Sequence, residues 1–292
     1  MSTWVQTWRD RRRTFVRPFL IGELLVVFVL LHVYDYVRSL EAVRMPAALR
    51  NGIDVLNAEH DLHINIEYGA NHWLAHHQTL STLLVWWYQY SHITGTMAVL
   101  ACCYLWFPHL YRSARNSLVL TNCVGMVVYV LLPVMPPRLL PGAGFIDTVA
   151  LAGFGADHGG PVQPAQFAAM PSLHLAWATW VALVTFTMLR GKPHRRLVFI
   201  YPVITATSVI TTGNHYVLDV VAGVVLAVAA CALCGVFGFT WRPAIHLLPV
   251  PAPVEARAVP GPGKPLAEGI AFERPVVETA PLDDPARLVQ PG

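Results

Sequence analysis

Six long apolar segments constrain the fold of this chain more than any other feature. A helix that crosses the hydrocarbon core of a membrane needs about 20 mostly apolar residues. The candidate spans are residues 18–36, 84–107, 117–135, 173–189, 197–213 and 216–239. Only 13% of the residues are charged, whereas a soluble domain carries about 25%. The sequence therefore predicts an all-α, polytopic membrane protein with a bundle of six transmembrane helices.

The basic residues predict the orientation of this bundle, because loops rich in lysine and arginine stay on the cytoplasmic side. They precede the first span and lie between the second and third and between the fourth and fifth. They are Arg9, Arg11, Arg12, Arg13, Arg17, Arg112, Arg115, Arg190, Lys192, Arg195 and Arg196. Both termini should then be cytoplasmic. We expect a multi-pass protein of the cell membrane whose active site faces the extracytoplasmic side.

The flanking segments differ from the spans in composition. Residues 1–17 form a basic cytoplasmic N-terminus, and no small-residue cleavage site follows the first apolar stretch, so we interpret that stretch as an uncleaved helix. Residues 37–83 mix polar and apolar residues at helical spacing, as expected of helices lying on the outer membrane surface. Residues 241–292 are rich in proline, alanine and glycine and predict a disordered cytoplasmic tail. The membrane domain is thus residues 18–240.

The histidines and cysteines of the chain are the residues that could form a metal or redox site. Five histidines fall in the 60–77 segment, and they are His60, His63, His72, His76 and His77. A zinc site is one interpretation, but no cysteine or H-E-x-x-H pattern accompanies them, so polar faces of interfacial helices are favoured. The five cysteines all lie in apolar runs, and the pair Cys231 and Cys234 lies inside a helix without a redox context. We expect no metal and no cofactor.

Three polar clusters interrupt the apolar spans, and the predicted topology puts all three at outward ends. The first, "PVMPPRLLPG", contains Arg138. The second, "AAMPSLHLAW", contains Ser172 and His174. The third, "TTGNHYVLDVVAG", contains His215 and Asp219. Ionisable groups in membrane segments are costly and usually functional, so the coincidence of three clusters on one side predicts a site.

The chemistry of these clusters fits phosphoryl transfer. Asp219 follows His215 by one helical turn and can hold its imidazole in one tautomer, although a structural ion pair would look the same. His174 can protonate a leaving oxygen. Ser172 begins a helix whose free N–H groups favour an anion, and Arg138 is a forked cation suited to phosphate oxygens. The net charge of +3 is too small and dispersed to suggest nucleic acid.

"PSLH" followed by "GNHYVLD" resembles the second and third signature motifs of the type 2 phosphatidic acid phosphatase superfamily, and "PPRLLP" resembles a diverged first motif. Within this superfamily, the stretches "AAMPSLHLAW" and "HYVLDVVAG" are most similar to the branch that contains the inositol phosphorylceramide synthases. The resemblance implies a six-helix membrane bundle in which His215 becomes phosphorylated and Asp219 orients it. It further implies that His174 protonates the leaving group, that Ser172 binds phosphate, and that Arg138 is the first-motif arginine.

The sequence departs from the family pattern at three positions. The first-motif lysine is replaced by Leu131, the third-motif arginine by Val209, and the second-motif glycine by Leu173. Two of the family's three cations are therefore absent, which should suit a singly charged phosphodiester better than a dianionic monoester. Asn214, or a histidine from residues 60–92, could supply compensating donors to the phosphate.

The leading hypothesis is a metal-independent lipid phosphatase that cleaves a lipid phosphate ester at the outer leaflet through a phosphohistidine intermediate. One alternative is an inositol-phosphate-type phosphotransferase that moves the phosphorylated head group to a lipid or alcohol acceptor. Another is a non-catalytic lipid transporter or scaffold, which predicts that at least one of His174, His215 and Asp219 is lost, whereas all are present.

Overall fold

The computed structural model describes residues 18–39, 41–154 and 167–238. In these residues the chain is helical and no β-strand is present, which confirms the all-α prediction. The elements are α2 (Leu20–Ser39), α3 (Glu41–Asp61), α4 (Glu67–Ala75), α5 (Gln78–Trp106), α6 (Pro108–Leu131), η1 (Pro137–Leu139), α7 (Thr148–Leu151), α8 (Leu173–Met188), η2 (Pro193–Phe199), α9 (Ile200–Thr211) and α10 (Val217–Leu233). The predicted N-terminus, 1–17, and the predicted tail, 241–292, lie outside the described residues.

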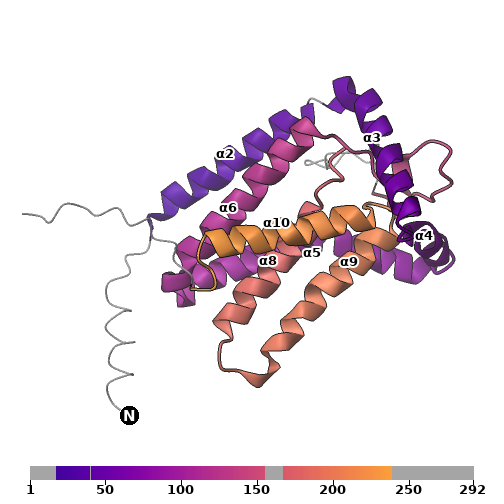
Figure 1. Cartoon of the computed structure of the whole chain (residues 1–292). Helices are drawn as coiled ribbons and strands as arrows, with labels where there is room; N and C mark the ends of the chain where they lie inside the picture. The colour runs from indigo at the N-terminus through magenta and orange to yellow at the C-terminus, as the bar shows by residue number, and fades with distance from the viewer. Residues whose placement is uncertain (1–17, 40, 155–166, 239–292) are drawn as a thin grey trace, which may run out of the picture. The chain divides into compact units, whose positions relative to one another are not determined.

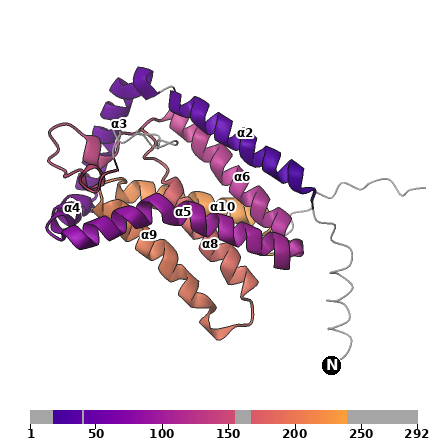
Figure 2. The ribbon, with the colours of Figure 1, turned by 180° about the vertical axis from the view of Figure 1, so that it is seen from behind.

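Helix α8 is the centre of the bundle, where it packs against α5, α6, α9 and α10 (Figures 1 and 2). An apolar helix without a polar face is expected to be surrounded in this way. Trp180 of α8 is fully buried, and its indole N–H donates to the Ala114 carbonyl and the Ser117 hydroxyl of α6. These bonds hold α8 against α6, and the starts of α8 and α10 carry predicted site residues.

Two helices in the described part of the chain are long and apolar enough to cross a membrane, Leu20–Val37 and Pro108–Leu131. Helices α8 and α10 are apolar but shorter, with 16 and 17 residues. The last predicted span, 216–239, is shortened because α10 ends before Gly235, which has a positive φ. Large apolar side chains nevertheless cover the outer faces of the helices, among them Leu24, Phe28, Val127, Val203 and Leu233. These faces indicate a membrane protein.

The third predicted span begins earlier than expected. Pro108 occupies the first turn of α6, where its missing N–H is not needed. As a result Arg112 and Arg115 lie inside α6 and not in a loop. Arg115 forms an ion pair with Glu23 of α2, with an N–O distance of 3.0 Å, which fixes α2 alongside α6.

Helices α3 and α4 contact the rest of the bundle through buried polar side chains. Glu59, Glu67 and Asn71 are each fully buried. The Asn71 amide donates to the carbonyls of Ile146 and Thr211 and accepts from the Ile146 N–H. The polar residues of the 37–83 segment therefore do not all lie on an exposed face. Asn71 is buried and joins the backbone at Ile146 to the end of α9.

Candidate active site

The three polar clusters predicted to share one side meet in the structure. The Ser172 N–H, at the start of α8, donates to the Asp219 carbonyl in the first turn of α10, at 3.0 Å. The Arg138 N–H in η1 donates to the Gly213 carbonyl in the turn between α9 and α10, at 2.9 Å. Backbone hydrogen bonds therefore join segments that are far apart in sequence.

His215 lies in the turn between α9 and α10, with only 4% of its surface exposed. Its Nδ1 atom lies 2.9 Å from the Ala169 carbonyl oxygen and 3.5 Å from Oδ2 of Asp219. Since a carbonyl oxygen can only accept, Nδ1 carries the proton and the neutral ring keeps its lone pair on Nε2. The lone pair of Nε2 is the electron pair that a nucleophilic histidine needs.

Asp219 is fully buried and performs two tasks. One carboxylate oxygen accepts the Tyr216 N–H at 2.9 Å and so caps α10, and the same oxygen faces His215. The sequence predicted that both residues lie on one face of a single helix. In the structure α10 begins at Val217, so the carboxylate reaches back across the helix start to His215. Its other oxygen has no hydrogen bond in the described part of the chain.

His174 faces the Nε2 atom of His215 from the first turn of α8. Its Nδ1 lies 3.4 Å from Nε2 of His215. Its ring is stacked on Tyr88 at 4.5 Å between centroids and meets His92 edge-on at 4.3 Å. In-line attack places phosphorus between the nucleophile and the leaving oxygen, and 3.4 Å between the nitrogens leaves no room for it. A phosphorus atom would fit between the two rings only if they lay further apart.

Tyr88 and His92 of α5 were not predicted as site residues individually, although His92 falls in the 60–92 range named for compensating donors. His92 Nδ1 donates to the Tyr88 carbonyl at 2.9 Å, one turn earlier on α5. The sequence signal that could have pointed to them is the cluster of aromatic residues at 86–90, whose other members suggest an interfacial belt. These two rings restrict where His174 can move.

Ser172 is the N-cap of α8 and is fully buried. Its hydroxyl oxygen accepts the Leu175 N–H at 3.3 Å, as N-cap serines commonly do. The hydroxyl hydrogen is still able to donate to an anion at the helix N-terminus, where the dipole of α8 favours negative charge. The structure thus gives Ser172 a capping role and leaves it compatible with the predicted phosphate contact.

Arg138 is held by an acid that the sequence analysis missed. Its Nη1 lies 2.7 Å from Oδ2 of Asp147, and its Nε donates to Oδ1 of Asn214 at 2.9 Å. The Asn214 amide nitrogen in turn donates to the Thr212 hydroxyl at 2.7 Å. The Asn214 side chain therefore orients Arg138, and the charge of this cation is balanced by Asp147.

The histidines of the 60–77 segment make contacts that do not converge. His72 Nε2 is 2.9 Å from the Gly144 carbonyl, while His76 and His77 donate to carbonyls one turn earlier on α4. No three His, Cys, Asp or Glu side chains gather into a metal-binding group in the ranges that the structure describes. The contact of His72 connects α4 to the 143–147 loop, whereas those of His76 and His77 stay within the end of α4.

The comparisons with known proteins bear on the same region. The sequence matches the family model described as PAP2 superfamily over residues 53–233, more than half of the chain. This segment includes all six predicted site residues and the helices that hold them. No curated protein and no solved structure shows significant similarity to the chain. The superfamily generally comprises phosphatases and phosphotransferases. The match over this length shows that the chain belongs to the PAP2 superfamily.

Proposed function

We propose that this chain is an integral membrane enzyme that cleaves a lipid phosphate ester at the outer leaflet through a phosphohistidine formed on His215. The observation that carries the proposal is the hydrogen bond from His215 Nδ1 to the Ala169 carbonyl, which leaves the lone pair on Nε2, facing His174. A nucleophile, an acid and an anion-binding helix start are then adjacent, as phosphoryl transfer requires.

The proposed reaction has two steps. The Nε2 atom of His215 attacks phosphorus, the P–N bond forms, the P–O bond breaks, and His174 gives its proton to the leaving oxygen. A water or alcohol then attacks the phosphohistidine, His174 takes the proton of that nucleophile, and the P–N bond breaks. The Asp219 carboxylate stabilises the imidazolium character that develops on His215.

A singly charged phosphodiester is the substrate class that the charges favour. Arg138 is already paired with Asp147, so little uncompensated positive charge is available for a dianion. At the two positions where family members carry further cations, Val209 is fully buried and Leu131 is 76% exposed on the outer face of α6. These features support a substrate of the phosphodiester class, like that of the inositol phosphorylceramide synthases that the motifs resemble.

The molecule that accepts the phosphoryl group from His215 decides between the two activities: water makes the enzyme a phosphatase, and an alcohol makes it a phosphotransferase. The groups around His215 are the same for water and for an alcohol acceptor, so we propose phosphatase activity first and head-group transfer to a lipid or alcohol as the alternative. A non-catalytic transporter is disfavoured because His174, His215 and Asp219 are retained and brought together.

The proposed chemistry is tested by trapping the intermediate. Purified protein is incubated with a lipid phosphodiester carrying labelled phosphorus and is then quenched. We expect acid-labile, base-stable label on wild type and none on His215→Ala, while His174→Ala should become labelled from an aryl phosphodiester, whose leaving group departs without a proton. Label on His215→Ala, or near-normal turnover by that variant, would mean that His215 and Asp219 form a structural ion pair.

We also propose six membrane crossings with the site facing outward, which the apolar outer faces of the helices support. Single cysteines at Gly144 and Gly261, in a background without native cysteines, test this topology. An impermeant thiol reagent is expected to label position 144 and not position 261 in intact cells. The reverse pattern would place the site on the cytoplasmic side.

A further inference from the structure

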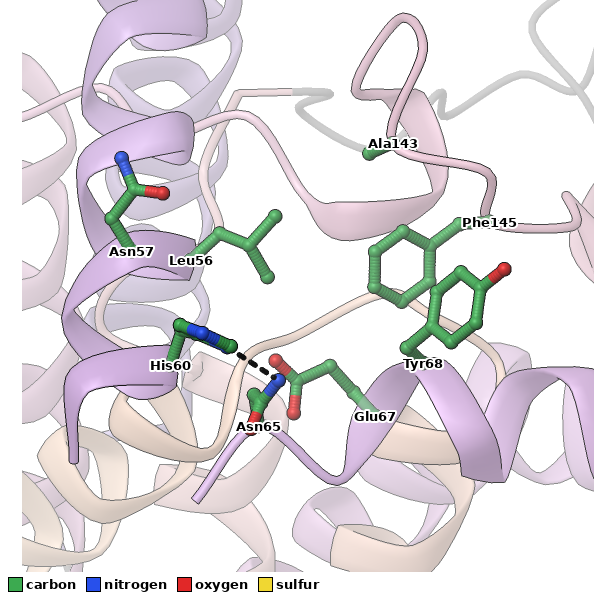
Figure 3. Close-up of a pocket in the computed structure, with 8 residues that line it drawn as sticks. All are labelled: Leu56, Asn57, His60, Asn65, Glu67, Tyr68, Ala143 and Phe145. Carbon is green, nitrogen blue, oxygen red and sulfur yellow. Dashed lines mark hydrogen bonds between the residues drawn. The ribbon is translucent and has the colours of Figure 1, made fainter. Parts of the chain in front are cut away.

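Helices α3 and α4 meet at a pair of buried acids, Glu59 and Glu67. Figure 3 shows Glu67 at the start of α4 and His60, the neighbour of Glu59, at the end of α3, both lining a cavity of about 240 Å³. The oxygens of Glu67 have almost no exposed surface, and the two acids share a side-chain hydrogen bond. Each carboxyl group is therefore the partner of the other.

A hydrogen bond between two carboxyl groups contains one proton, because an ionised carboxylate can only accept. Burial, together with the adjacent Glu67, raises the pKa of Glu59 to about 9, so Glu59 carries this proton at neutral pH. The negative charge that remains lies on Glu67 in the first turn of α4, where the helix dipole favours an anion. Glu59 is thus a neutral group that donates to Glu67.

The Glu59 carboxyl group also reaches the start of α10. Its Oε1 atom accepts the Leu218 N–H at 2.6 Å. This N–H is one of the groups at a helix start that have no partner within the helix. The next residue, Asp219, accepts the Tyr216 N–H and faces His215. Two carboxyl groups therefore hold the first turn of α10, one from the helix itself and one from α3.

We propose that Glu59 is a positioning residue of the active site, whose neutral carboxyl group fixes the first turn of α10 and with it the Asp219 carboxylate beside His215. The inference rests on the proposed function, since Glu59 would affect turnover only through these two residues. The protonated group accepts from α10 and donates to α4 at the same time, which an ionised carboxylate cannot do.

The neutral state of Glu59 matters because of the groups that face it. Those of α4 and α10 are Glu67, Tyr216 and Asp219, and Asp219 connects Glu59 to His215. Loss of the shared proton would place three buried carboxylates around the first turn of α10, where they would repel one another. We therefore expect kcat to fall as the pH rises through about 9.

Two variants of the full chain and a control, in nanodiscs, test this role. Glu59→Leu removes the acceptor for Leu218, and kcat for a lipid phosphodiester should fall by about tenfold or more with little change in KM, because misplaced groups lower the rate of chemistry. Glu59→Gln keeps an acceptor for Leu218 and a donor to Glu67, so it should retain most of the turnover at neutral pH. Asp54→Asn, at an exposed acid of α3, should match wild type.

The pH profile separates positioning through the shared proton from a purely structural role. Wild-type kcat should fall through about pH 9, whereas Glu59→Gln, which has no proton to lose at this position, should not show this fall. The unfolding midpoint of each variant shows that it is folded. A fall that persists in Glu59→Gln would overturn the proposal, and this comparison does not require Glu59→Leu to fold.

Hydrogen–deuterium exchange tests the contact without turnover. The Leu218 amide should exchange faster in Glu59→Leu than in wild type, and at nearly the wild-type rate in Glu59→Gln. This exchange pattern would support the contact even if wild type cleaved no phosphodiester, in which case the proposed function alone would fail. Unchanged exchange and turnover in Glu59→Leu would overturn the proposal. An equal loss of turnover in Glu59→Leu and Glu59→Gln would overturn it as well.

Discussion

The backbone of Gly223 in α10 lies so close to Ser172 that a Cβ atom at position 223 would be 2.3 Å from the Ser172 carbonyl oxygen. Gly223→Ala must therefore push the starts of α8 and α10 apart. Such overpacking costs about 1–3 kcal/mol, and it would also displace Ser172 from Asp219. We expect a lower unfolding midpoint and a large loss of turnover.

Gly69→Ala is the matched control for this substitution. Gly69 also lies in a helix, α4, but a Cβ atom there would have no neighbour within 4 Å. Stability and turnover should be close to wild type. Equal effects of the two substitutions on the unfolding midpoint and on turnover would show that neither depends on the close contact between α8 and α10.

Tyr88 is expected to position His174, because their rings are stacked. Tyr88→Ala should lower kcat by tenfold or more for alkyl phosphate esters, whereas Tyr88→Phe keeps the ring and should retain most activity. The loss should be much smaller for an aryl ester, whose leaving group departs without a proton. An equal loss for both leaving groups would indicate a general structural defect and not a misplaced acid.

Asp147→Asn should increase the affinity of the site for inorganic phosphate. The substitution removes the negative charge that balances Arg138, while asparagine can still cap α7 through the oxygen that accepts from Val149 and Ala150. One additional charged hydrogen bond is worth about 1.5 kcal/mol, so the inhibition constant should fall about tenfold. The double variant with Arg138→Gln should lose this gain. A gain that persists would mean that Arg138 does not contact the anion.

Glu59 should make the protein less stable as the pH rises. Its pKa is about 9 in the folded state and 4.5 normally, so between these values the folded state holds a proton that the unfolded state releases. The free energy of unfolding then falls by up to about 1.4 kcal/mol per pH unit. Glu59→Gln, which keeps an acceptor for Leu218, should flatten this dependence. The other titratable groups nearby are Glu67, Tyr216 and Asp219.

Denaturant unfolding in detergent at about pH 6 and about pH 8 measures this slope. Asp54→Asn, at an exposed position of the same helix, should unfold with the wild-type dependence. If Glu59→Gln retained the full slope, another group would have to carry the raised pKa.

Activity should survive treatment with chelators, since the proposed anion site consists of Arg138, His174 and the N–H groups of α8, and the nucleophile is a side chain. Turnover is measured before and after EDTA and dialysis. A loss that zinc restores would instead make the histidines of the 60–77 segment a ligand set.

Residues with strong local signals were predictable from the sequence. Ser172 begins α8 as an N-cap, and the segments with Arg138, His174 and His215 meet as their shared side suggested. Apolar composition, however, does not show at which residue a helix begins or ends. The span predicted at 197–213 starts as the tight helix η2, and α9 proper has only 12 residues.

The parts of the site that escaped prediction depend on contacts across long sequence separations. Nothing local to Tyr88 indicates that its ring will stack on His174, and nothing near Asp147 indicates Arg138 as its partner. Glu59 looked like one polar residue among many on an amphipathic helix. Its role in capping α10 becomes visible only when the two helices are placed together.

Asn71 has a consequence for how relatives of this chain can be recombined. Its amide bonds the 146 backbone on one side and the end of α9 on the other, although the signature motifs begin some 65 residues later, near position 136. A chimaera that joins the motif half of one relative to the first helices of another would therefore combine Asn71 from one protein with its hydrogen-bond partners, Ile146 and Thr211, from the other. Successful exchanges should take α2 to α10 as a single block, with crossover points before Leu20 or after Leu233, because Glu23 of α2 is paired with Arg115 of α6.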